Sequence, residues 1–204
     1  MDGISSSDPN GDTLTYSWSA HGITFEDSAS PTPTATFPLG NTMVTLVVND
    51  GTIDSEPDTV TITVEDTTPP TLTATANPSS IWSPNGKYQS ITLVITTSDV
   101  RDPSPTITAT VQSNEPDDAK GNGDGNTTGD IKVTTAGGDV LLSSNEFPQV
   151  SLDSINDQLE LRVERSGVGE ERTYTISITA TDASGNQTTK TLIVTVPHDQ
   201  RKIP

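Results

Sequence analysis

The stretch TYTISITAT, Thr173 to Thr181, decides the fold class. From Tyr174 to Ala180 an apolar side chain stands at every second position, with threonine or serine between. A period of two residues puts one set of side chains on each face of a strand, so the pattern predicts a strand with one face in a core and the other in water. The run TVTITV, Thr59 to Val64, repeats the pattern. No window combines an apolar period of 3.6 residues with helix caps, so we expect an all-β protein.

Similar runs recur along the whole chain, separated by clusters of glycine, proline, asparagine and aspartate, the residues of turns. In QLELRVER, residues 158–165, the alternation places Glu160, Arg162 and Glu164 on the face expected to meet water. Short strands at this spacing are typical of immunoglobulin-like β-sandwiches. The predicted strands are residues 13–19, 42–49, 58–65, 71–76, 88–98, 105–112, 130–134, 139–142, 157–165, 172–181 and 187–196.

The segment EDTTPPT, Glu65 to Thr71, marks a domain boundary, because its two prolines stiffen the chain and remove donors that a sheet would need. We therefore predict two tandem immunoglobulin-like sandwiches, residues 1–65 and 66–204. The first is shorter than the ~100 residues of a complete sandwich, which predicts that its first strand is missing. The second has its surplus length mostly in an acidic loop rich in glycine and asparagine, residues 113–130.

Charge and composition exclude several classes of function. The 28 acidic residues outnumber 10 basic ones, so the net charge of −18 would repel nucleic acid and anionic membrane surfaces. No apolar run approaches the ~18 residues of a membrane span, so we expect no membrane insertion. Cysteine is absent, and the only histidines, His21 and His198, cannot be joined to a nucleophile and an orienting group. We therefore expect no enzyme.

Two motifs near the start carry a resemblance to a known family. DGISSSDPNGDTLTYSWS, residues 2–19, is followed by VTLVVNDGTIDSEPDTVTITV, residues 44–64. Together they resemble a PKD repeat, named after polycystic kidney disease, over residues 2–65. The resemblance implies a seven-strand sandwich whose first strand would precede Met1. It also implies that the loop from Asp8 to Asp12 binds calcium, as it does in some members.

The second domain carries five short motifs: WSPNGK from Trp82, SNEP from Ser113, RVERSG from Arg162, TDASGN from Thr181 and VPHDQ from Val196. They resemble the signatures of an immunoglobulin-like domain found at the end of secreted bacterial proteins. The resemblance implies an extracellular or cell-surface location and no assigned enzymatic activity. A cysteine pair common in that family near SDVRDPSP is absent here.

A first candidate calcium site lies just before the first predicted strand. Asp8, Asn10 and Asp12 offer oxygen ligands at alternate positions, and Gly11 permits a tight turn among them. Calcium takes six to eight oxygen ligands from clusters of this kind. Asp50, at the end of a neighbouring predicted strand, would contribute a fourth. The alternative is that these residues form turns by accepting bonds from their own backbone.

A second candidate site joins the domain boundary to the second domain. It combines Asp66 with Asp99 and Asp102 of SDVRDPSP and with Asp182 of TDASGN. A bound calcium ion would replace repulsion among the carboxylates with coordination bonds and would fix the angle between the domains. The alternative is that these residues are ordinary polar turn formers.

The acidic loop, residues 113–130, is a third candidate. Its aspartates include Asp124 and Asp130, and NGDGN supplies glycines for a tight turn around a cation. A solvated loop without an ion explains the same composition.

The aromatic residues could either bind a sugar or pack in the core. Trp18 in YSW is expected in the core. Trp82 and Tyr88 flank a proline turn, where an exposed pair of rings would stack on a sugar and a buried pair would close the end of the core.

The sequence thus predicts a non-catalytic extracellular module for structure and adhesion, a calcium-stiffened spacer of a secreted or cell-surface bacterial protein. Its partners would be other modules of the same polypeptide or neighbouring subunits. One alternative is a carbohydrate-binding accessory module of a secreted hydrolase, with polysaccharide bound at Trp82 and Tyr88. Another is a subunit of an extracellular filament, in which a neighbour donates a strand to the incomplete first domain.

Overall fold

The computed structural model describes residues 1–115, 128–135, 138–142, 158–165 and 171–197. These ranges contain eleven strands and no helix, so the all-β prediction is confirmed, and each strand lies within three residues of its predicted bounds. It follows that the described part of the chain holds no apolar helix that could cross a membrane. The chain divides into two compact units, residues 1–66 and 67–204.

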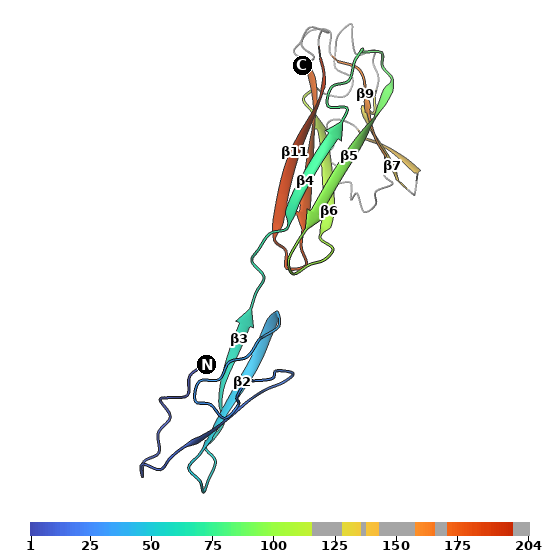
Figure 1. Cartoon of the computed structure of the whole chain (residues 1–204). Helices are drawn as coiled ribbons and strands as arrows, with labels where there is room; N and C mark the ends of the chain where they lie inside the picture. Colours follow the sequence, from blue (N-terminus) through green and yellow to red (C-terminus); the bar gives the residue numbers. More distant parts are fainter. Residues whose placement is uncertain (116–127, 136–137, 143–157, 166–170, 198–204) are drawn as a thin grey trace. The chain divides into compact units, whose positions relative to one another are not determined.

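The first unit is built on one antiparallel sheet of three strands in the order β1-β2-β3 (Figure 1). Its strands are β1 (Thr15–Ala20), β2 (Gly40–Asn49) and β3 (Asp58–Val64). Trp18 and Val44 are the buried hydrophobic side chains of this unit, which confirms the core position predicted for Trp18. The Trp18 indole donates a hydrogen bond of 3.0 Å to the Ser30 carbonyl, so the chain between β1 and β2 covers part of one face.

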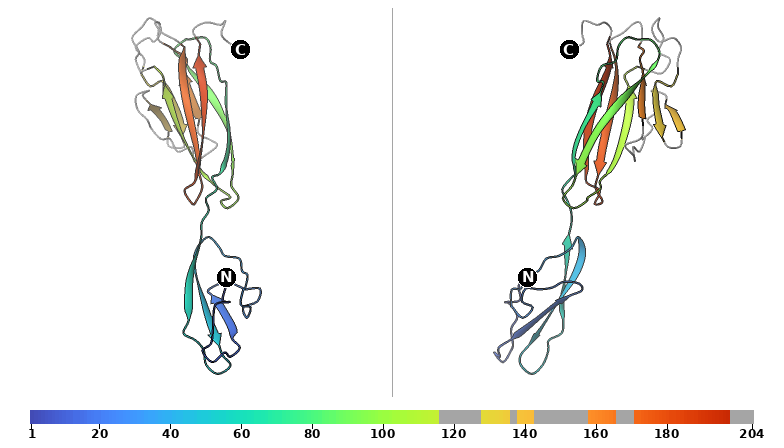
Figure 2. Two further views of the ribbon diagram at one scale, coloured as in Figure 1. Left: turned by 90° about the vertical axis from the view of Figure 1, so that its left-hand side faces the viewer. Right: turned by 45° about the vertical axis from the view of Figure 1, so that its right-hand side comes forward.

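The second unit contains two antiparallel sheets (Figure 2). One has the order β11-β10-β6, and the other has the order β4-β5-β9-β7-β8. Their strands are β4 (Thr71–Asn77), β5 (Tyr88–Ser98), β6 (Thr106–Ser113), β7 (Ile131–Thr135), β8 (Gly138–Leu142), β9 (Gln158–Arg162), β10 (Arg172–Thr181) and β11 (Gln187–Val196).

Strand β10 supplies the centre of the core in the second unit. Its apolar set, Tyr174, Ile176, Ile178 and Ala180, is fully buried, while the residues between are partly exposed. Tyr174, Ile176 and Ile178 share one cluster with residues of the other sheet, such as Leu161, so the two sheets pack face to face. Full burial of one large apolar side chain contributes about 1.5–3 kcal/mol.

The segment that follows β4 also meets the end of β11. Ser80 forms a parallel bridge with Thr195. The Ile81 N–H donates to the Thr195 carbonyl at 2.8 Å, and the Thr195 N–H donates to the Ser79 carbonyl at 3.0 Å. Ile81 is 3% exposed, so its side chain anchors this connection in the core.

Candidate metal centre

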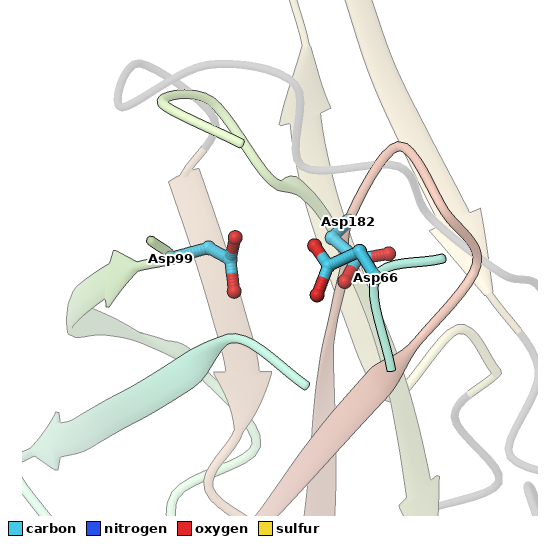
Figure 3. Close-up of side chains that lie close together, drawn as sticks. All are labelled: Asp66, Asp99 and Asp182. Atoms are coloured by element: carbon cyan, nitrogen blue, oxygen red, sulfur yellow. The ribbon is translucent and has the colours of Figure 1, made fainter. Parts of the chain in front are cut away.

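Three aspartates gather at one end of the second unit. Asp99 directly follows β5, Asp182 directly follows β10, and Asp66 immediately precedes Thr67, where the unit begins. One carboxylate oxygen from each lies within 4.8 Å of the others (Figure 3). Asp182 is buried, and the other two are half-buried. The structure therefore brings together three of the four residues of the second predicted site.

The Asp182 side chain is fixed by the TDASGN turn. Its Oδ1 accepts backbone bonds from Ser184 at 2.9 Å and Asn186 at 2.8 Å, and its Oδ2 accepts a bond of 2.8 Å from the Asn186 amide. Gly185 closes the turn with a φ of +90°, which L side chains rarely adopt. Burial is the largest single influence on the pKa of Asp182 and would raise it, but the bonds from Asn186, Ser184 and Gly185 together lower that pKa below its usual value.

The loop after β5 has a similar construction. Asp99 Oδ1 accepts backbone bonds from Arg101 at 2.7 Å and Asp102 at 2.8 Å. Asp102 is not a member of the group of three. Instead its Oδ2 accepts a bond of 2.9 Å from the Ala183 N–H, so Asp102 ties this loop to the TDASGN turn. That bond holds together the two loops that carry Asp99 and Asp182.

The spacing of the three carboxylates suits a hard cation. Calcium binds oxygen at about 2.3–2.6 Å, so two oxygens on one ion are separated by at most about 5 Å. The group of three meets this limit, because its three carboxylate oxygens all lie within 4.8 Å of one another. Three negative charges at this range repel one another. A divalent cation among them would attract all three carboxylates and outweigh their mutual repulsion. Water or backbone carbonyls would have to complete the coordination shell.

The loop of the first candidate site has a different arrangement. Asp8 Oδ1 accepts backbone bonds from Asn10 at 2.7 Å and Asp12 at 3.2 Å, and Asp50 Oδ1 accepts them from Thr52 and Ile53. The bonds from Ile53 and Thr52 lower the pKa of Asp50. The carboxylates of Asp8, Asp12 and Asp50 do not form a close group like that of Asp66. The observed contacts are those of the turn-forming alternative.

The third candidate loop is described only at its two ends. Asp124 lies outside the described residues. Asp130 is fully buried, and its Oδ2 lies 2.8 Å from the Arg172 guanidinium. Its carboxylate thus already faces a cation supplied by the protein.

Arg172 is the centre of a buried ionic cluster that the sequence reasoning missed. The fully buried guanidinium lies 3.2 Å from Glu115 and 3.7 Å from Glu164, in addition to its contact with Asp130. Arg162 approaches both Asp130 and Glu164 at 3.6 Å. The prediction that Arg162 and Glu164 face water is wrong, because their side chains are 14% and 3% exposed. Charges so deeply buried must be paired.

Two tyrosines complete this cluster. The Tyr174 hydroxyl donates to the Arg162 carbonyl at 2.8 Å, and the Tyr88 hydroxyl donates to the Gly129 carbonyl. Arg162 also donates to the Tyr88 hydroxyl at 2.8 Å. Arg162 also donates to the Gly86 carbonyl at 3.0 Å, so residues of the SNEP, RVERSG and WSPNGK motifs meet in this cluster. Motifs read one at a time along the chain gave no sign of that meeting.

The two candidate sugar-binding rings are in different environments. Trp82 is 38% exposed. Tyr88 is half-buried, with the Arg162 guanidinium 4.4 Å from its ring centre. Burial is the main cause that raises the pKa of Tyr88. The two rings do not form one exposed strip, because Tyr88 belongs to the ionic cluster.

Comparison with known proteins assigns the chain to no family. No family model matches the chain, and a search of curated proteins finds no match.

Proposed function

We propose that the chain is a non-catalytic extracellular structural and adhesion module, a calcium-stiffened spacer built from two tandem immunoglobulin-like units. The observation that carries the proposal is the group formed by Asp66, Asp99 and Asp182, whose oxygens lie within 4.8 Å of one another. A calcium ion there would tie the segment that enters the second unit to two of its loops.

The remainder of the molecule is consistent with this role. The second unit has the face-to-face sheets and alternating strands of a sandwich. Outside cells calcium reaches millimolar levels, and extracellular modules bind it with Kd values of about 0.1–1 mM. A surface dominated by acidic residues, with a net charge of −18, would attract the ion before it binds.

The test is thermal unfolding in excess chelator and then in about 10 mM calcium. With the Kd range above, binding to the folded state alone stabilises it by about 1.4–2.7 kcal/mol. We expect the melting temperature of the second unit to rise by several degrees. Trp82 reports on this unit once Trp18 is replaced by phenylalanine, because the chain has two tryptophans.

The variant Asp99→Asn sharpens the test. Asparagine keeps an Oδ1 that can accept the bonds from Arg101 and Asp102, but it removes the charge. We expect it to abolish most of the calcium-dependent shift, while Glu56→Gln in the first unit keeps the shift. A melting temperature that is the same with chelator and with calcium would refute the metal centre.

A further inference from the structure

Strand β3 ends the sheet of the first unit and leaves one edge open. No backbone hydrogen bond from the described residues reaches β3 from that side. Proteins usually protect such an edge with lysine, proline, a bulge or a covering segment. The strand DTVTITV contains neither lysine nor proline. By contrast, the edge of β1 is covered, because the Trp18 N–H donates to the Ser28 carbonyl at 3.0 Å.

The same contacts show in which direction the backbone of β2 is oriented. Since the Trp18 N–H points away from β2, its partner Leu46 must direct its own N–H toward β3. Val48, two residues further, confirms this direction, because its N–H donates to Ser55 Oγ at 3.1 Å. The even-numbered residues of β2 therefore bond to β3.

The alternation then continues into β3 itself. Val44 lies opposite Val60, so Val60 uses its backbone groups to bond to β2. Thr59, Thr61 and Thr63 must direct their N–H and C=O groups outward. The open edge thus presents three donors and three acceptors in a row, which is the template for an added strand.

An apolar strip runs beside this row of backbone groups. Val60 is 52% exposed, although it shares a face with the buried Val44. Ile62 and Val64, on the same face, are half-buried. An added strand with apolar side chains at alternate positions would cover this strip and extend the small core of the unit.

Charge selects the kind of strand. Residues 1–66 contain eight aspartates and three glutamates, eleven acids in all, and no lysine or arginine. Asp58 begins β3, and Glu65 follows it directly, so acids flank both ends of the open edge. A second copy of this unit would be repelled, whereas a basic segment would be attracted.

We propose that the outer edge of β3 binds an extended polypeptide segment that alternates apolar and basic side chains. The segment adds a fourth strand through the backbone of Thr59, Thr61 and Thr63. Its apolar side chains cover Val60 and Ile62, and its basic side chains lie near the flanking acids. This site is independent of the calcium centre, so each proposal can fail without the other.

The probe is a labelled nine-residue peptide of alternating lysine and valine with capped ends. Its binding to the full chain is measured by fluorescence anisotropy. We expect saturable binding that weakens as salt is raised, because the charges lie at the surface. Thr61→Pro removes one outward N–H but no bond to β2, and we expect it to weaken binding about tenfold. Thr61→Ser keeps that N–H and should leave the affinity within about twofold.

Two further comparisons make the result decisive. Val60→Lys keeps every backbone group and repels the basic peptide, so it should also weaken binding about tenfold, even if Thr61→Pro disturbs the fold. A peptide with proline in place of its central valine should bind weakly, and a peptide of alternating glutamate and valine should not bind. Equal binding of the proline peptide, equal binding of the acidic peptide, or self-association of the free chain that Thr61→Pro abolishes would each overturn the proposal.

Discussion

Replacing Arg172 with methionine should destabilise the second unit more than almost any other single change. The guanidinium is fully buried and lies 2.8 Å from Asp130, 3.2 Å from Glu115 and 3.7 Å from Glu164. Methionine fills much of the same volume but leaves these carboxylates without that cation. Removing one partner of a buried ion pair costs about 3–5 kcal/mol, because water does not replace the lost cation beside the buried charge that remains. For a unit of this size that loss lowers the melting temperature by roughly 10–20 °C.

The assay is urea and thermal unfolding followed by Trp82 fluorescence in a Trp18→Phe background. Trp18 lies in the first unit and Trp82 in the second, so the first unit serves as an internal control in the converse background. Adding Asp130→Asn to Arg172→Met should recover part of the loss, with a coupling free energy of about 0.5–3 kcal/mol. A loss below about 1 kcal/mol in the single variant, or strict additivity in the double variant, would refute the cluster as a stabilising network.

Four further outcomes are expected. Burial raises the pKa of Tyr174 above its usual value. The contribution of Tyr174 to stability is therefore complete below pH ~10 and is lost as the pH rises through the higher pKa of the folded state. Tyr174→Phe should flatten the alkaline limb of a plot of unfolding free energy against pH. The lowered pKa of Asp182 acts in the opposite direction. The contribution of Asp182 to the unfolding free energy is present above pH ~3.9 and is lost as the pH falls through the lower pKa of the folded state, so Asp182→Asn should flatten the acid limb of the same plot. Ile178→Ala removes a fully buried side chain and should cost about 2–5 kcal/mol by urea unfolding. Gly185→Ala places a side chain at a φ of +90° and should cost about 1–2 kcal/mol, while Gly185→Asn should cost less in the same assay.

The strands could be predicted because their signal is local. TYTISITAT shows its inner and outer faces in nine consecutive residues, and β10 buries the predicted set. Turn residues such as Gly185 mark where each strand ends. Neither observation requires knowledge of which strands are neighbours.

Glu164 shows where that reasoning stops. The alternation in QLELRVER placed Glu164 on the face expected to meet water, yet Glu164 is as buried as its neighbour Val163 on the opposite face. In the structure its partner Arg172 comes from another strand. Asp130, which shares the Arg172 guanidinium with Glu164, comes from the end of a distant loop. A charge enters the interior only when such partners meet, and that meeting depends on the topology of the whole unit.

The candidate metal centre has the same dependence on topology. Asp99 and Asp182 follow strands of different sheets, and the bond from the Ala183 N–H to Asp102 joins the two loops that carry them. The loop at Asp8, which has the more suggestive local spacing, instead uses its oxygen to form its own turn. Local spacing of acidic residues therefore says less about a shared ion than the positions of strand ends.

The parallel bridge between Ser80 and Thr195 has a mechanical consequence. Tension along the chain enters the second unit near β4 and leaves it after β11, and the two bonds of Thr195 to Ser79 and Ile81 join those two regions. Since the joined segments run parallel, pulling them apart loads both bonds in shear, and they must break together rather than one after the other. The resistance of the second unit to force would then depend on this short contact. The buried side chain of Ile81 would hold the segment in place by its packing in the core.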